Sequence, residues 1–114
     1  MLTYAVIIFF IGALGGLFLA SKVLFNKLAP WPVSIVHALL GAIGIILLIT
    51  ALVEGQQSGR LTAALILFII AALGGFFLAS FHVRQKIAPK AIVIIHASIA
   101  VLGFLTLLSL VLGL

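Results

Sequence analysis

Four long apolar runs restrict the fold of this 114-residue chain more than any other feature. They cover about Thr3–Phe25, Trp31–Val53, Leu61–Val83 and Ala91–Gly113, and each is close to the ~20 residues that cross a bilayer as a helix. Because 67% of the residues are hydrophobic and only 6% are charged, polar side chains are too few to cover a soluble domain. We therefore predict a single all-α membrane domain, residues 1–114, whose four transmembrane helices have the lipid bilayer as solvent.

The second half of the chain repeats the first half without a gap. Residues 3–55 align with residues 62–114, and glycine, proline and histidine recur at matching positions. Each repeat holds two helices, so both repeats enter the membrane from the same side and form a parallel repeat, not an inverted one. We expect two tandem hairpins, related by a pseudo-two-fold axis along the membrane normal and packed as a four-helix bundle.

Basic residues gather in two of the three connections between the apolar runs. The first and third connections hold five of the six, whereas residues 54–60 carry one acid and one base. The positive-inside rule then predicts that these two connections lie in the cytoplasm and both termini outside. We expect an integral protein of the bacterial inner membrane. No basic and aromatic residues interleave as they do on a nucleic-acid surface, so we expect no nucleic-acid partner. The absence of cysteine excludes iron–sulfur clusters and thioether-linked haem.

One histidine lies inside the second run and one inside the fourth, at matching positions of the two repeats. His37 lies roughly 8 Å inside its predicted helix, and the repeat places His96 at the same depth. An ionisable side chain in a membrane helix is costly and marks a functional site by default. Two imidazoles are too few for zinc, which takes four ligands. They suit haem, because the porphyrin supplies four nitrogens and the protein supplies the axial pair.

Small residues accompany the histidines. Each histidine has a small residue four positions on and a glycine seven positions on, which keeps all three on one side of a helix. We expect this face to leave space for a flat ring, with further glycines on the first and third helices either widening that space or serving helix–helix contact alone. The residues in question are Gly41, Gly44, Ala100, Gly103, Gly15, Gly16, Gly74 and Gly75.

The basic residues near the predicted cytoplasmic ends have two interpretations. They either contact haem propionates or only lipid headgroups, since the positive-inside rule alone would produce them. His82 has no histidine counterpart in the other repeat and is expected in the headgroup region, with a propionate or quinone contact as the alternative. The set is Lys22, Lys27, His82, Arg84, Lys86 and Lys90.

A small four-helix membrane bundle with histidines on two helices resembles the membrane-embedded b-type cytochromes, such as cytochrome b561-like proteins and respiratory haem anchors. Only His37 and His96 carry this resemblance chemically. It implies electron transfer through haem b held by two histidines. Members with two haems need four histidine ligands, and this chain has three histidines in all, so we expect at most one haem.

Our leading hypothesis is a membrane electron carrier with one haem b between the second and fourth helices. It would work with quinone or quinol, or inside a larger respiratory or photosynthetic complex or a homodimer. Two axial histidines leave no open iron position, so we expect a relay or subunit and not an enzyme. The alternatives are a cofactor-free accessory subunit whose histidines bond between helices, a small transporter, and a (bacterio)chlorophyll-binding subunit.

Overall fold

The chain is entirely helical in the computed structural model, which describes all 114 residues. The four helices are α1 (Leu2–Leu24), α2 (Trp31–Val53), α3 (Gly59–Val83) and α4 (Lys90–Leu112), and there are no strands. Each helix is long and apolar enough to cross a membrane. The predicted four-helix membrane fold is confirmed, and every predicted helix boundary lies within two residues of the observed one.

The two hairpin connections share one backbone design. Just beyond α1 and α3, Asn26 and Gln85 adopt positive φ angles of 59° and 55°, which turn the chain out of the helix. Pro30 and Pro89 then stand immediately before α2 and α4 with φ angles of −71° and −60°. Proline suits this position because the first turn of a helix needs no N–H donor from it.

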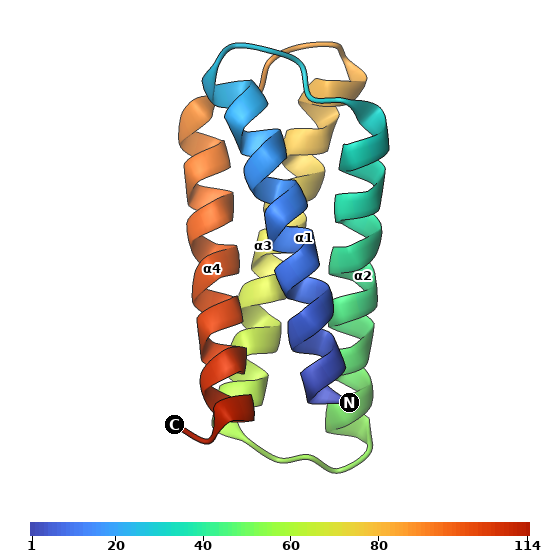
Figure 1. Ribbon diagram of the computed structural model, residues 1–114, viewed down its shortest axis with the longest axis vertical. Coiled ribbons are helices and arrows are strands. Elements are labelled where there is room, and N and C mark those ends of the chain that lie inside the picture. The colour runs from blue at the N-terminus through green and yellow to red at the C-terminus, as the bar shows by residue number, and fades with distance from the viewer.

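The helices form a bundle in which α1 lies diagonally opposite α3, and α2 lies diagonally opposite α4 (Figure 1). The α1–α2 and α3–α4 connections lie at one end, and both termini lie at the other end with the α2–α3 connection (Figure 1). We call the first of these the basic end. It carries Lys22, Lys27, Arg84, Lys86 and Lys90.

The buried core fills only the half of the bundle nearer the termini. Phe9 and Phe68 stack at its centre with ring centroids 3.8 Å apart and planes 1° apart. Leu48, Leu61 and Leu107 are the largest fully buried side chains, and they join this pair in one cluster. Dispersion contacts in such a layer are what hold helices together when lipid removes the hydrophobic incentive to associate.

The half nearer the basic end contains almost no fully buried residues. Residues 13–43 and 72–102 make up this half, and only Ala88 and Val93 among them are buried. Small residues on α1 and α3 and half-buried side chains on α2 and α4 face one another here. We call this half, with few fully buried residues, the open half, and both intramembrane histidines belong to it.

Replacing Gly44 by alanine is expected to lower stability by about 1–3 kcal/mol, the usual cost of overpacking. A β-carbon at Gly44 would collide with the ring of Phe9, which is held in place by its stack on Phe68. Gly41, one turn away on α2, has no neighbouring heavy atom within 4 Å of such a carbon, so Gly41→Ala should be neutral. Thermal unfolding in detergent, followed by circular dichroism, measures both, and equal midpoints would contradict this account of the core.

Candidate functional site

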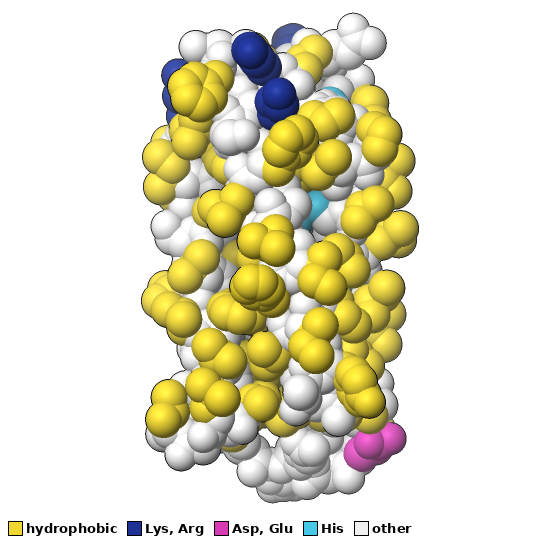
Figure 2. Space-filling model, viewed as in Figure 1, with side chains coloured by type: hydrophobic (Ala, Val, Ile, Leu, Met, Phe, Trp, Pro, Cys, Tyr) yellow, Lys and Arg dark blue, Asp and Glu magenta, His cyan; other side chains and the backbone are white.

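Two imidazoles face each other across the open half of the bundle. His37 extends from α2 and His96 from α4, with ring centroids 6.3 Å apart and ring planes at 76°. Both rings are half-buried. Figure 2 shows histidine in cyan between the apolar side chains of the surface at mid-height. The structure thus brings together the two residues that the sequence singled out.

Each imidazole is held by a bond to the backbone of the preceding helix. Nδ1 of His37 lies 2.8 Å from the carbonyl oxygen of Gly12, and Nδ1 of His96 lies 2.7 Å from that of Ala71. A carbonyl only accepts hydrogen bonds, so Nδ1 carries the proton in both rings and the neutral ring has a free lone pair on Nε2. Metal-binding histidines are oriented in the same way, by a bond from the other ring nitrogen.

Both Nε2 atoms lack a hydrogen-bond partner. Neither takes part in any hydrogen bond of the structure, and no buried side-chain nitrogen or oxygen is left without a partner. The two Nε2 atoms are therefore not enclosed by the protein's own packing. An unpaired polar atom is costly in an apolar medium, so this arrangement favours a ligand that engages Nε2.

Glycines on α1 and α3 accommodate the imidazoles. A β-carbon at Gly16 would lie 2.9 Å from Cε1 of His37, and one at Gly75 would lie 3.3 Å from Cε1 of His96. Gly15 and Gly74 flank the same rings, at 3.9 Å from Cβ of His37 and 3.5 Å from Nδ1 of His96. The absence of side chains lets each ring lie directly against the neighbouring helix.

The remaining small residues lie in different surroundings. A β-carbon at Gly44 would meet the phenyl ring of Phe9, and one at Gly103 would meet that of Phe68. These two glycines therefore leave room for the stacked phenyl rings. Gly41 has nothing nearby, and Ala100 is half-buried at the matching position of α4. The phenyl stack was not anticipated from the sequence, although phenylalanine recurs at the two matching positions.

His82 forms a separate cluster at the basic end. Its ring stacks on the indole of Trp31, with centroids 3.8 Å apart and planes 7° apart. Its Nδ1 lies 3.2 Å from Oγ of Ser34. These contacts join α3 to α2, and therefore one hairpin to the other. Ser34 lies one turn before His37 on α2, yet its hydroxyl contacts His82 and not His37.

The basic residues lie outside the histidine layer, at the end of the bundle. The ammonium of Lys22 is 5.2 Å from the ring centroid of Phe18, and the guanidinium of Arg84 is 4.7 Å from that of Phe81. Phe18 and Lys22 both lie in α1, whereas Arg84 immediately follows α3, the helix of Phe81. The only acidic residue, Glu54, follows α2 at the opposite end of the bundle, so no carboxylate side chain is there to pair with these cations.

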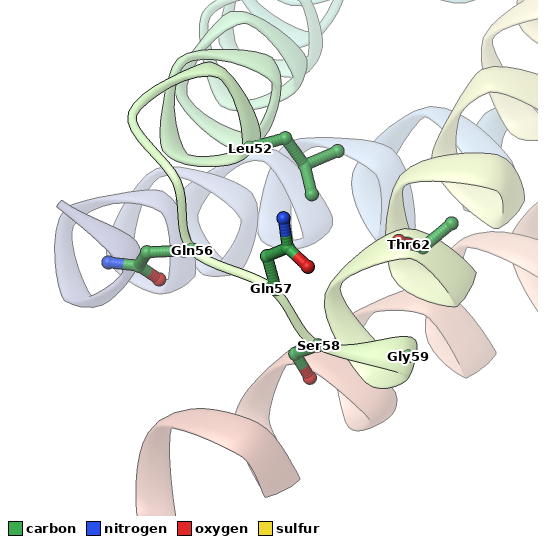
Figure 3. A pocket seen from close by; sticks show the side chains of 6 residues that line it. All are labelled: Leu52, Gln56, Gln57, Ser58, Gly59 and Thr62. Carbon is green, nitrogen blue, oxygen red and sulfur yellow. The ribbon is translucent and has the colours of Figure 1, made fainter.

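Two surface hollows accompany this arrangement. One is an apolar groove of about 510 Å³ between α1 and α2 that reaches an imidazole, lined by Ile11, Leu14, Gly15, Pro32, Val33, Val36, His37 and Leu40. The other, of about 430 Å³, lies at the α2–α3 connection, and it is lined by Leu52, Gln56, Gln57, Ser58, Gly59 and Thr62 (Figure 3). Gln57 points toward Leu52, whereas Gln56 points away (Figure 3). This second hollow has no ionisable lining residue, so only the first adjoins candidate chemistry.

The ligand set limits what can bind between the histidines. No group of three or more histidine, cysteine, aspartate or glutamate side chains comes together in the chain, so the protein alone does not complete a zinc site. A pair of imidazoles fits a metal that brings its other ligands with it. Comparisons with protein-family models, curated protein sequences and solved structures find no match to this chain.

Replacing either intramembrane histidine by alanine is expected to destabilise the cofactor-free protein by about 0.6–2 kcal/mol, the range for interhelical hydrogen bonds in membranes. His37→Ala and His96→Ala each remove one bond between the helices of a hairpin. Ser98 on α4 is exposed and makes no side-chain hydrogen bond, so Ser98→Ala is the control. Unfolding midpoints of protein produced without haem provide the measurement, and unchanged midpoints in both histidine variants would argue against the bonds.

Proposed function

We propose that this chain is a membrane electron-transfer protein that binds one haem b between His37 and His96. The observation that carries the proposal is the pair of neighbouring imidazoles on two apolar helices, each with Nδ1 hydrogen-bonded to a backbone carbonyl and Nε2 without a partner. Intramembrane groups with unmet bonding capacity are costly and are retained for function. The open half of the bundle surrounds this pair.

The separation of the rings supports a single shared metal. An imidazole nitrogen binds a metal at about 2 Å, and it lies roughly 1 Å from its ring centroid, so two imidazoles on opposite sides of one metal have centroids about 6 Å apart. The observed separation is 6.3 Å. Two separate pigments, each with one histidine ligand, would require the rings to be much farther apart.

The four helices would divide the binding task in pairs. His37 on α2 and His96 on α4 would hold the iron through their Nε2 atoms. Gly15 and Gly16 of α1 and Gly74 and Gly75 of α3 would keep the two imidazoles in place, because the rings lie directly against them. Haem supplies a one-electron couple between ferric and ferrous iron. The carbonyls of Gly12 and Ala71 hold the imidazole rings in place. The stacked rings of Phe9 and Phe68 would limit the access of water to the haem from the end that carries the termini.

The surroundings favour a relay over an enzyme. Two axial histidines would occupy both free positions of the iron, and the short connections provide no domain for a second cofactor. The proposed location is a bacterial inner membrane with the basic end in the cytoplasm. The proposed partner is quinone or quinol, or a larger respiratory complex.

A cofactor-free accessory subunit is the rival function, and one observation favours it. The Nδ1 bonds already join α1 to α2 and α3 to α4, which is what histidines with a purely structural task would do. This rival does not account for the two free Nε2 atoms or for the scarcity of fully buried residues around them. It predicts a protein without colour.

The deciding measurement is an optical spectrum of the purified protein, air-oxidised and then reduced with dithionite. We expect a Soret band and sharp reduced α and β bands at one haem per chain, lost in His37→Ala and in His96→Ala. His82→Ala is the matched control and should keep the spectrum, because its ring belongs to the separate cluster with Trp31. A colourless wild-type protein, produced with ample haem, would reject the proposal in favour of the accessory subunit. A long-wavelength pigment band would reject it in favour of chlorophyll.

The ring angle gives an independent prediction. With imidazole planes at 76°, the ferric protein should show the strongly anisotropic low-spin electron paramagnetic resonance signal of near-perpendicular axial ligands. Parallel rings give a rhombic low-spin signal instead. Replacing Phe9 with leucine changes the buried core and not the imidazoles, so it should leave the signal type unchanged because the carbonyl bonds set the ring planes. A rhombic spectrum from the wild-type protein would show that the rings turn when the cofactor binds.

A further inference from the structure

The basic end presents five cations that have no carboxylate side chain to pair with. They are Lys22, Lys27, Arg84, Lys86 and Lys90, and the only acidic side chain of the chain, that of Glu54, belongs to the opposite end. Figure 2 shows lysine and arginine side chains gathered at the top of the molecule and the acidic side chain at the bottom. The side-chain charge at this end is therefore positive and attracts negatively charged partners.

The lysines at the tips of the connections are held by folded turns. The N–H of Lys27 donates to the carbonyl of Lys22 across 2.8 Å, and the N–H of Lys86 donates to the carbonyl of Phe81 across 2.9 Å. The preceding residues, Asn26 and Gln85, have the positive φ angles that these turns require. Both lysines are exposed. A surface with a fixed backbone loses less entropy when a partner binds than a flexible one.

The histidine pair lies much nearer this end than the other. Along α2, His37 is about 9 Å from Trp31 at the basic end and about 24 Å from Val53 at the far end, by the helical rise. The shorter path passes through the open half of the bundle. The longer path passes through the stack of Phe9 on Phe68 and the buried leucines. Of the two ends of the bundle, the basic end therefore offers an electron the shorter path to the histidine layer.

We propose that the basic end is the docking surface for an acidic one-electron carrier protein, which exchanges electrons with the histidine pair through this end. The electron step rests on the proposed haem function, whereas the docking step does not. In the exchange, one electron passes from the reduced carrier to the oxidised centre, and no atom or proton needs to move. Complementary charge of this kind mainly raises the association rate and selects the partner.

The docking step is tested on protein without cofactor. The His37→Ala/His96→Ala double variant is placed in nanodiscs of zwitterionic phosphatidylcholine, and a fluorescent poly-glutamate peptide serves as the probe, followed by anisotropy. We expect binding at low salt that weakens as salt is added. Lys27→Gln and Lys86→Gln should each weaken it about fivefold. Arg60→Gln removes one positive charge from the far end and should leave it unchanged.

Two results would overturn docking at the basic end. One is an equal loss of affinity in Arg60→Gln and Lys27→Gln, because net charge alone would then explain the binding. The other is loss of peptide binding when a minority of phosphatidylglycerol is added to the nanodiscs, because anionic lipid headgroups would then be the occupant of this end. Retained binding in such nanodiscs supports a protein partner.

The electron step is tested separately on the coloured wild-type protein in zwitterionic nanodiscs, which leave both ends accessible. Oxidation of the reduced protein by the anion ferricyanide should slow with added salt and in Lys27→Gln/Lys86→Gln, and should be unaffected in Arg60→Gln. A rate that depends on Arg60 and not on the lysines would overturn the exchange through the basic end. A colourless wild-type protein would reject the haem proposal while the peptide experiment still decides the docking step.

Discussion

The bond from an imidazole to a backbone carbonyl of the neighbouring helix is the interaction around which this molecule is arranged. In a hydrocarbon medium polar groups find their partners inside the protein, and here each histidine obtains one from the helix it packs against. The bond sets the separation of the helices in each hairpin and requires glycine where the ring lies. It also decides which nitrogen keeps its proton. Fold and chemistry are thus linked through a single contact made in each hairpin.

The division of the bundle into a tight half and an open half follows from where its large side chains lie. Phe9 and Phe68 fill the space that Gly44 and Gly103 provide, and leucines close the layers toward the termini. At the level of the histidines no large side chain is fully buried. A bundle packed tightly along its whole length would be more rigid, yet it would have no interior position for a ligand. The open half therefore accords with a binding role, and the tight half holds the four helices together.

The sequence predicts well where the helices begin and end, and it predicts poorly which face of each helix is turned toward the interior of the bundle. Boundaries near Trp31, Val53 and Val83 follow from the length of the apolar runs and from proline and basic residues at their ends. The faces turned inward are harder to identify, because a membrane helix is apolar all around and lacks the amphipathic pattern of a soluble one. Only polar or very small residues indicate the inward face, and His37 and Gly16 could therefore be identified from the sequence as site residues. Phe9 was missed because it resembles its lipid-facing neighbour Phe10, and Trp31 and His82 were missed as partners because neither repeats.

The contact of His82 with Trp31 and Ser34 occurs at only one of the two junctions between the hairpins. At the other junction the matching positions hold Val23, Lys90 and Val93. A dimer of two identical hairpins would carry this contact at both junctions or at neither. Joining two hairpins in one chain allows each to change alone, so the two imidazoles no longer have identical surroundings. The two histidines are therefore inequivalent, which a symmetric assembly of two identical hairpins does not allow.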